Sequence, residues 1–111
     1  MNFQHKQLAE KNWVKLSFFQ QMANIGSEVE RAIKWKVKGN RDYSRLSFER
    51  ALELLGLTID GAKKSRLKEL TRLREVLVDY FAYKNVYRSS EKNLHNYFYG
   101  FNYAARLNRR F

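Results

Sequence analysis

The chain has 111 residues, enough for one domain, and its composition (44% hydrophobic, 30% charged) is that of a globular protein. It contains neither cysteine nor proline, so disulfides, thiolate metal sites and cysteine nucleophiles are excluded, and no proline interrupts a helix. The net charge is +11, and residues 61–111 alone carry twelve basic and four acidic side chains, a net charge of +8. This excess favours an anionic partner, either nucleic acid or an acidic protein.

The sequence offers no signal for export or membrane insertion. The first 15 residues contain four charged side chains and no apolar run of signal-peptide length. No window holds 18 consecutive apolar residues, as a membrane-spanning helix would need. We therefore expect a cytoplasmic protein without a membrane anchor, folded as a single domain over residues 1–111.

The first strong helical pattern begins at Ser17. Ser17 and Gln20 have the spacing of a capping box, and Gly39 followed by Asn40 predicts the end of the helix. Residues 4–16 also have a helical pattern, and whether they continue this helix stays open. Apolar residues recur at steps of three and four, which places them on one helix face: Phe18, Phe19, Met22, Ile25, Val29, Ala32 and Ile33.

Three more helices are predicted, over residues 42–59, over residues 64–83, and after a cap at Ser89 or Ser90. No segment alternates apolar and polar residues over the length of a strand. Helices joined by short loops predict an all-α fold, an antiparallel four-helix up-and-down bundle with a possible extra helical segment at the N-terminus. The apolar faces of these helices are predicted to contain Leu46, Phe48, Leu52, Leu55, Ile59, Leu67, Leu70, Leu77, Phe81, Leu94, Phe98 and Phe101.

Two expectations about the core follow from these faces. Phe81, Phe98 and Phe101 should fill the core between the third and fourth helices, because they follow the apolar faces of both. Leu52, Leu55, Leu70, Leu77 and Phe101 should be largely buried.

Motifs for metals, nucleotides and nucleophilic catalysis are absent from the sequence. The two histidines belong to no E-x-x-H motif, and the glycines form no phosphate-binding loop. Glu49 and Glu53 share a helix face, but Arg45 and Arg50 nearby favour ordinary surface ion pairs. We therefore expect neither a metal site nor a cofactor.

Aromatic and basic residues are concentrated together near the C-terminus. Ten aromatic residues fall in the last 32 positions, and aromatics among basic side chains can stack bases and bind phosphates. Tyr99 and Tyr103 lie four apart and off the main apolar face, so they face solvent or form a second buried seam, such as a homodimer interface. The candidate anion-binding residues are Lys84, Arg88, Lys92, Arg106, Arg109 and Arg110.

Residues 30–59, ERAIKWKVKGNRDYSRLSFERALELLGLTI, resemble the HEPN family of small helical domains at Gly39, Tyr43, Phe48, Ala51 and Glu53. Active HEPN domains are metal-independent ribonucleases with an R-x(4–6)-H motif near the last helix, acting at a dimer interface. Arg88 and His95 match this motif with six residues between them. The resemblance implies that Arg88 stabilises phosphate charge and that His95 assists proton transfer.

The sequence leaves three functions open. The first is a non-catalytic binding module for an anionic partner, nucleic acid or acidic protein; the resemblance adds a nucleotidyltransferase as a possible partner. The second is a HEPN-like ribonuclease that uses Arg88 and His95. The third is a homo-oligomeric scaffold with a tyrosine-rich interface.

Overall fold

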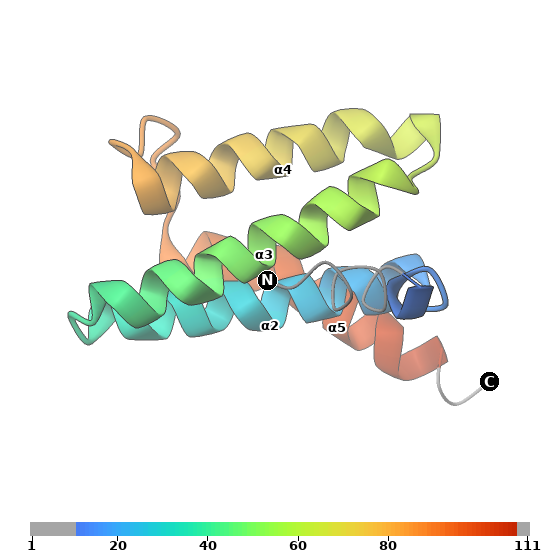
Figure 1. Cartoon of the computed structure of the whole chain (residues 1–111), viewed down its shortest axis with the longest axis horizontal. Helices are drawn as coiled ribbons and strands as arrows, with labels where there is room; N and C mark the ends of the chain where they lie inside the picture. The colour runs from blue at the N-terminus through green and yellow to red at the C-terminus, as the bar shows by residue number, and fades with distance from the viewer. Residues whose placement is uncertain (1–10, 109–111) are drawn as a thin grey trace.

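The computed structural model describes residues 11–108, and within this range it contains helices and no strand. The long helices are α2 (Phe18–Val37), α3 (Arg41–Asp60), α4 (Lys64–Ala82) and α5 (Glu91–Asn108). Consecutive helices run in opposite directions (Figure 1), so the predicted all-α, up-and-down bundle is confirmed. None of the helices described is long and apolar enough to cross a membrane.

The N-terminal helical segment does not continue α2. Residues 11–13 are helical, but a turn over residues 14–16 separates them from Phe18. Trp13 is nevertheless buried, and its indole nitrogen donates a hydrogen bond to the hydroxyl oxygen of Thr58 in α3 at 3.0 Å. The rest of the predicted segment, residues 4–10, lies outside the described residues.

The predicted helix ends agree closely with the observed ones. The capping box is present, because Ser17 Oγ accepts from the Gln20 backbone N–H and Gln20 Oε1 accepts from the Ser17 N–H. At the starts of α3 and α5, the side-chain oxygens of Asn40 and Ser90 each accept a hydrogen bond from the backbone N–H three residues later. Gly39 has a φ of +81°, which glycine tolerates without strain. By contrast, the N-cap residue of α4, Lys63, makes no capping hydrogen bond with its side chain.

The α2–α3 contact buries small polar residues that the apolar pattern did not predict. Ser44, Ser47 and Thr58 all lie on the buried face of α3, and Ser44 Oγ donates to the backbone carbonyl of Ala32 in α2 at 2.8 Å. This hydrogen bond offsets the cost of burying a hydroxyl. The buried face of α3 is therefore rotated from the predicted one, and the prediction that Leu46 belongs to it is wrong, because Leu46 is 57% exposed.

The α5 helix packs on α2 through a glycine. A Cβ atom placed on Gly26 would lie 2.8 Å from the Cβ of Phe98, and Phe98 is 1% exposed. Phe98 was expected to fill a core between α4 and α5, but this location is wrong. Because Gly26 has no side chain, α5 can approach α2 closely, and Phe98 is buried there. Phe101 contacts Phe18, with ring centroids 5.9 Å apart, and Phe81 contacts Phe48 of α3 at 5.0 Å.

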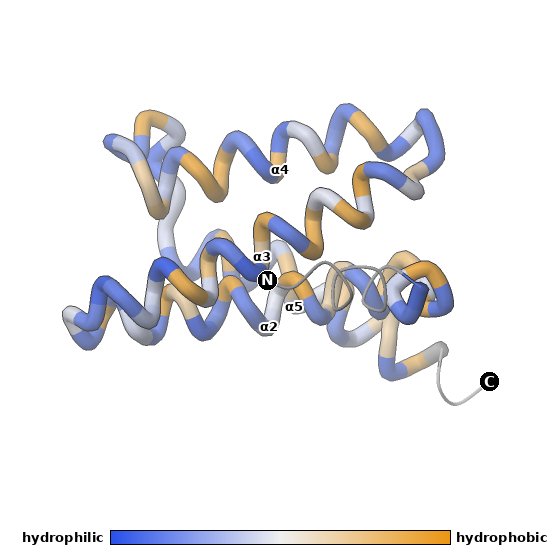
Figure 2. The backbone as a smooth tube through the Cα atoms, viewed as in Figure 1, coloured by the Kyte–Doolittle hydropathy of each residue, from blue (hydrophilic) through white to orange (hydrophobic). Residues whose placement is uncertain are grey.

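The hydrophobic core confirms most of the predicted buried residues. Leu55, Leu70 and Leu77 are fully buried, whereas Leu52 and Phe101 are partly buried at its edge. Figure 2 shows hydrophilic and hydrophobic residues alternating along each helix, as expected for helices with one apolar face.

A hydrogen bond joins α4 to α5. The Tyr97 hydroxyl donates to Glu69 Oε1 at 2.8 Å. Burial, together with this bond and the charge of Glu69, raises the pKa of Tyr97 well above its ordinary value. Tyr97 therefore marks the side of α5 that faces α4.

Candidate nucleic-acid interface

The outward side of α5 carries a line of aromatic and basic side chains, which we call the α5 stripe: Lys92, His95, Tyr99, Tyr103 and Arg106. Steps of three and four residues place all five on one side of the helix. All five are exposed, with Tyr99 at 54% and Tyr103 at 55%. Because Tyr97 and Tyr99 are two residues apart, the stripe lies on the side of α5 turned away from α4.

A small hollow joins two sets of residues that the sequence predicted separately. Tyr99, Tyr103, Arg106 and Leu107 surround a space of about 250 Å³. The candidate anion-binding Arg106 therefore lies beside the two candidate interface tyrosines. A phenol ring offers a flat apolar face to a base, and a guanidinium offers a fork of donors to a phosphate.

The structure pairs His95 with an acidic residue. His95 Nδ1 lies 2.7 Å from Glu30 Oε1 of α2, and both side chains are exposed. The His95 ring also lies beside the Tyr99 ring, with centroids 6.1 Å apart. Arg88 lies in the loop between α4 and α5, and no hydrogen bond or ion pair in residues 11–108 joins it to His95.

The remaining candidate residues occupy two places. Lys84 and Arg88 are exposed in the loop of residues 83–90, and Lys92 is exposed in the first turn of α5. Arg109 and Arg110 lie outside the described residues. The structure thus brings Lys92, His95, Tyr99, Tyr103 and Arg106 together and leaves Lys84 and Arg88 on the loop.

Sequence reasoning did not single out a group of positive charge at the start of α4. Between residues 63 and 74 there are six basic side chains and one acidic side chain, Glu69. The basic ones are Lys63, Lys64, Arg66, Lys68, Arg72 and Arg74. A count of charge along each predicted helix would have found this group, whereas a search for aromatic residues among the charges did not.

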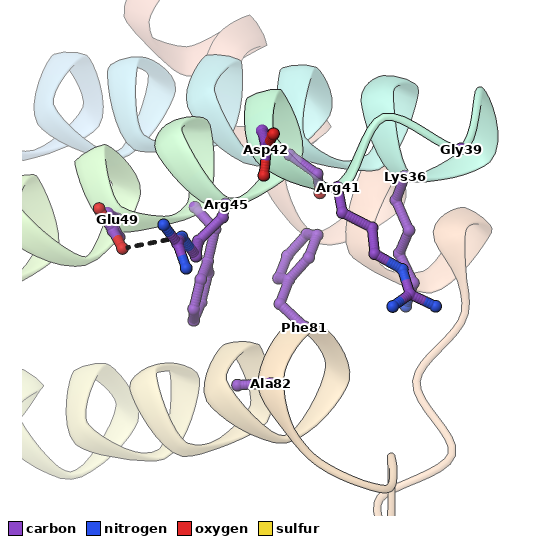
Figure 3. A pocket seen from close by; sticks show the side chains of 10 residues that line it. Lys36, Gly39, Arg41, Asp42, Arg45, Glu49, Phe81 and Ala82 are labelled. Atoms are coloured by element: carbon purple, nitrogen blue, oxygen red, sulfur yellow. Dashed lines mark ion pairs between the residues drawn. The ribbon is translucent and has the colours of Figure 1, made fainter.

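A larger cleft of about 850 Å³ opens between the start of α3 and the end of α4 (Figure 3). The rings of Phe48 and Phe81 form its apolar part. Arg45 is directed at Glu49, with 3.6 Å between nitrogen and oxygen, and Lys36 Nζ donates to a backbone carbonyl of α4 at 3.2 Å. Lys36 and Arg45 are therefore already engaged within the protein, and the carboxylates of Asp42 and Glu49 also line the cleft. The residues that the structure places around the hollow at Tyr99 and Tyr103 include no carboxylate.

No protein-family model matches the chain, and neither the curated proteins nor the solved structures compared with it include a match. The resemblance to HEPN domains therefore stays a prediction. In the part of the chain that the structure describes, histidine, aspartate and glutamate side chains nowhere gather in a group of three that could hold a metal ion.

Proposed function

We propose that this protein is a non-catalytic binding module for single-stranded nucleic acid, which it contacts through the α5 stripe. The observation that carries the proposal is the hollow that two exposed tyrosines line together with an arginine. Exposed aromatic rings next to cations are the usual elements of single-strand binding, because every base has a face that can stack.

The stripe has a length suited to several nucleotides. From Lys92 to Arg106 the helix rises about 21 Å, at 1.5 Å per residue. Tyr99 and Tyr103 would stack bases in the middle of this length, while Lys92 and Arg106 would contact phosphates at its two ends. The net charge of +11 would speed association with a polyanion.

An acidic protein is the less favoured partner, because it would use the cations but would not need two exposed rings beside them. Stacking contributes about 1–3 kcal/mol per base. Loss of both rings therefore predicts at least about 30-fold weaker binding of nucleic acid.

The proposal is tested by fluorescence anisotropy with a labelled single-stranded RNA and a labelled single-stranded DNA. Tyr99→Ala/Tyr103→Ala should bind far more weakly than the native chain, whereas the control Tyr43→Ala, with a tyrosine of similar exposure (51%) on α3, should bind as the native chain does. The affinity should fall with salt at a slope of about −0.7 for each phosphate contact.

Two results would overturn the proposal. Equal binding by the double variant and the control would exclude the tyrosines from the contact. If the native chain instead bound no nucleic acid and the double variant converted a dimer to a monomer in sedimentation velocity, the stripe would be a homodimer interface.

The HEPN-like ribonuclease is the second candidate, and the contact between His95 and Glu30 favours it. A carboxylate that accepts from Nδ1–H leaves Nε2 as the ring nitrogen able to accept a proton, as in oriented histidine bases. RNA cleavage without added metal, by the native chain and by His95→Ala, tests this candidate. Cleavage that requires His95 supports it, and equal results for both proteins refute it.

A further inference from the structure

A second basic surface lies on the outer side of α4. Lys64, Lys68 and Arg72 are four residues apart, which places them in one row along the helix, and all three are exposed. We call this row the α4 ladder. It spans about 12 Å, at 1.5 Å of rise per residue. Within residues 11–108, no ion pair joins any of the three to a carboxylate.

The spacing of the ladder opposes helix stability. Like charges four residues apart repel each other. Lys64 also lies in the first turn of α4, where the helix dipole disfavours positive charge, and that turn contains no acidic residue. A bound polyanion would relieve both effects, because it would supply the negative charge that the helix lacks.

The loop of residues 83–90, which follows α4, is held in a fixed shape. The carboxylate of Asp79, a buried residue of α4, accepts from the backbone N–H groups of Val86 and Tyr87, each at 2.9 Å. Two hydrogen bonds join Asn85 to Ser89: the Asn85 side-chain nitrogen donates to the Ser89 backbone carbonyl, and the Asn85 side-chain oxygen accepts from the Ser89 N–H.

The fixed loop is strained, and it exposes apolar side chains. Asn85 and Arg88 both have a φ of +54°, a conformation that residues other than glycine rarely adopt. The exposed large apolar side chains of the loop are those of Tyr83, Val86 and Tyr87. A strained loop that keeps apolar groups in water is typical of a binding site rather than of a simple connection.

The ladder and the loop meet at Tyr87. The Arg72 guanidinium carbon lies 5.7 Å from the centre of the Tyr87 ring, and the Tyr87 hydroxyl lies 3.5 Å from Glu75 Oε2. A row of cations therefore ends at an exposed aromatic ring. This surface is separate from the α5 stripe, which lies on the side of α5 turned away from α4.

We propose that the α4 ladder and Tyr87 form a second contact surface for single-stranded nucleic acid, so that one chain holds two segments of strand at once. The cations of the ladder contact successive phosphates, and Tyr87 stacks a base at the end of the row. The chemistry favours nucleic acid over an acidic peptide, because the row combines an exposed ring with cations that have no carboxylate partner within residues 11–108. This inference rests on the proposed function, since it assigns a second surface for the same ligand.

The test compares two triple variants that remove the same charge. Lys64→Gln/Lys68→Gln/Arg72→Gln removes the ladder, and Lys15→Gln/Lys34→Gln/Arg50→Gln removes three exposed cations from scattered positions. Isothermal titration calorimetry with a short single-stranded oligonucleotide gives the number bound per chain. Anisotropy at several salt concentrations gives the slope of log affinity against log salt.

The native chain and the scattered variant should bind two oligonucleotides, whereas the ladder variant should bind one. For a longer strand that reaches both surfaces, the salt slope of the ladder variant should be shallower by about 2, since each lost phosphate contact contributes about 0.7. Tyr87→Ala should weaken the second binding event alone.

The outcomes separate this inference from the proposed function. If the native chain binds one oligonucleotide and the ladder variant matches the scattered variant, the second surface is refuted while the α5 stripe stands. If the ladder variant loses binding and the tyrosine variant of the stripe does not, the α4 surface stands alone and the α5 proposal is refuted. If the native chain binds no nucleic acid, both are refuted.

Discussion

Replacing Gly26 by alanine tests the contact on which the position of α5 depends. Gly26 lies in the middle of α2, and its Cα faces Phe98 of α5. The added Cβ would lie 2.8 Å from Phe98 Cβ and 2.9 Å from two atoms of the ring. Because Phe98 Cβ is next to its own backbone, the clash cannot be relieved by a simple rotation of a flexible side chain.

Two opposing effects determine the magnitude. Overpacking of a tight contact costs about 1–3 kcal/mol, while alanine is better than glycine in a helix by about 0.8–1.0 kcal/mol. The expected net loss for Gly26→Ala is therefore roughly 0–2 kcal/mol. Gly100→Ala is the matched control, because it lies in a helix and nothing lies within 4 Å of its added Cβ. This control should gain about 0.5–1 kcal/mol.

Urea unfolding followed by circular dichroism measures both variants, and the difference between them isolates the clash at about 1–3 kcal/mol. If Gly26→Ala were stabilised as much as Gly100→Ala, α5 would not approach α2 at this point. The α5 stripe, which depends on the orientation of the helix, would then be placed wrongly.

Three further substitutions test the rest of the fold by the same unfolding measurement. Leu77→Ala, at a fully buried position in α4, should lose about 2–5 kcal/mol, while the exposed Leu46→Ala should change stability by less than about 0.5 kcal/mol. A loss for Leu77→Ala as small as that for Leu46→Ala would mean that α4 is rotated. Asp79→Ala should lose about 1.5–3 kcal/mol, because two backbone N–H groups lose a charged acceptor, and an effect no larger than that of the exposed Asp60→Ala would contradict the fixed loop. Above pH 10 the unfolded chain loses the Tyr97 proton while the folded chain keeps it, so native stability should fall more steeply there than that of Tyr97→Phe; parallel pH profiles would contradict the buried hydroxyl.

The helices and their ends could be predicted because local chemistry determines them. Ser17, Gln20, Gly39 and Asn40 act on their own backbone neighbours, so their spacing in the sequence is sufficient. The partner of each helix could not be predicted in this way. Gly26 has an ordinary appearance in the sequence, and only the Phe98 side chain beside it shows that it is a packing site.

Polar residues mark the limit of prediction from apolar periodicity. Ser44, Thr58 and Asp79 are buried because each has a hydrogen-bond partner distant in the sequence or in a following loop. The five residues of the α5 stripe were all predicted as candidates, but for different reasons: Lys92 and Arg106 as basic residues among aromatics, Tyr99 and Tyr103 from their spacing, and His95 from the resemblance to HEPN domains. The contact between His95 and Glu30 depends on how α5 packs on α2, which the spacing of residues in the sequence does not show.

Ultraviolet cross-linking of the native chain to single-stranded RNA, followed by mass spectrometry of the peptides, tests the central claim most directly. Aromatic rings stacked on bases are positioned for cross-linking, so the account predicts cross-links at Tyr99 and Tyr103 in α5. Competition with unlabelled RNA should remove them, and raised salt should weaken them. Cross-links confined to other parts of the chain, or none in the α5 peptide, would contradict the claim that this helix binds nucleic acid.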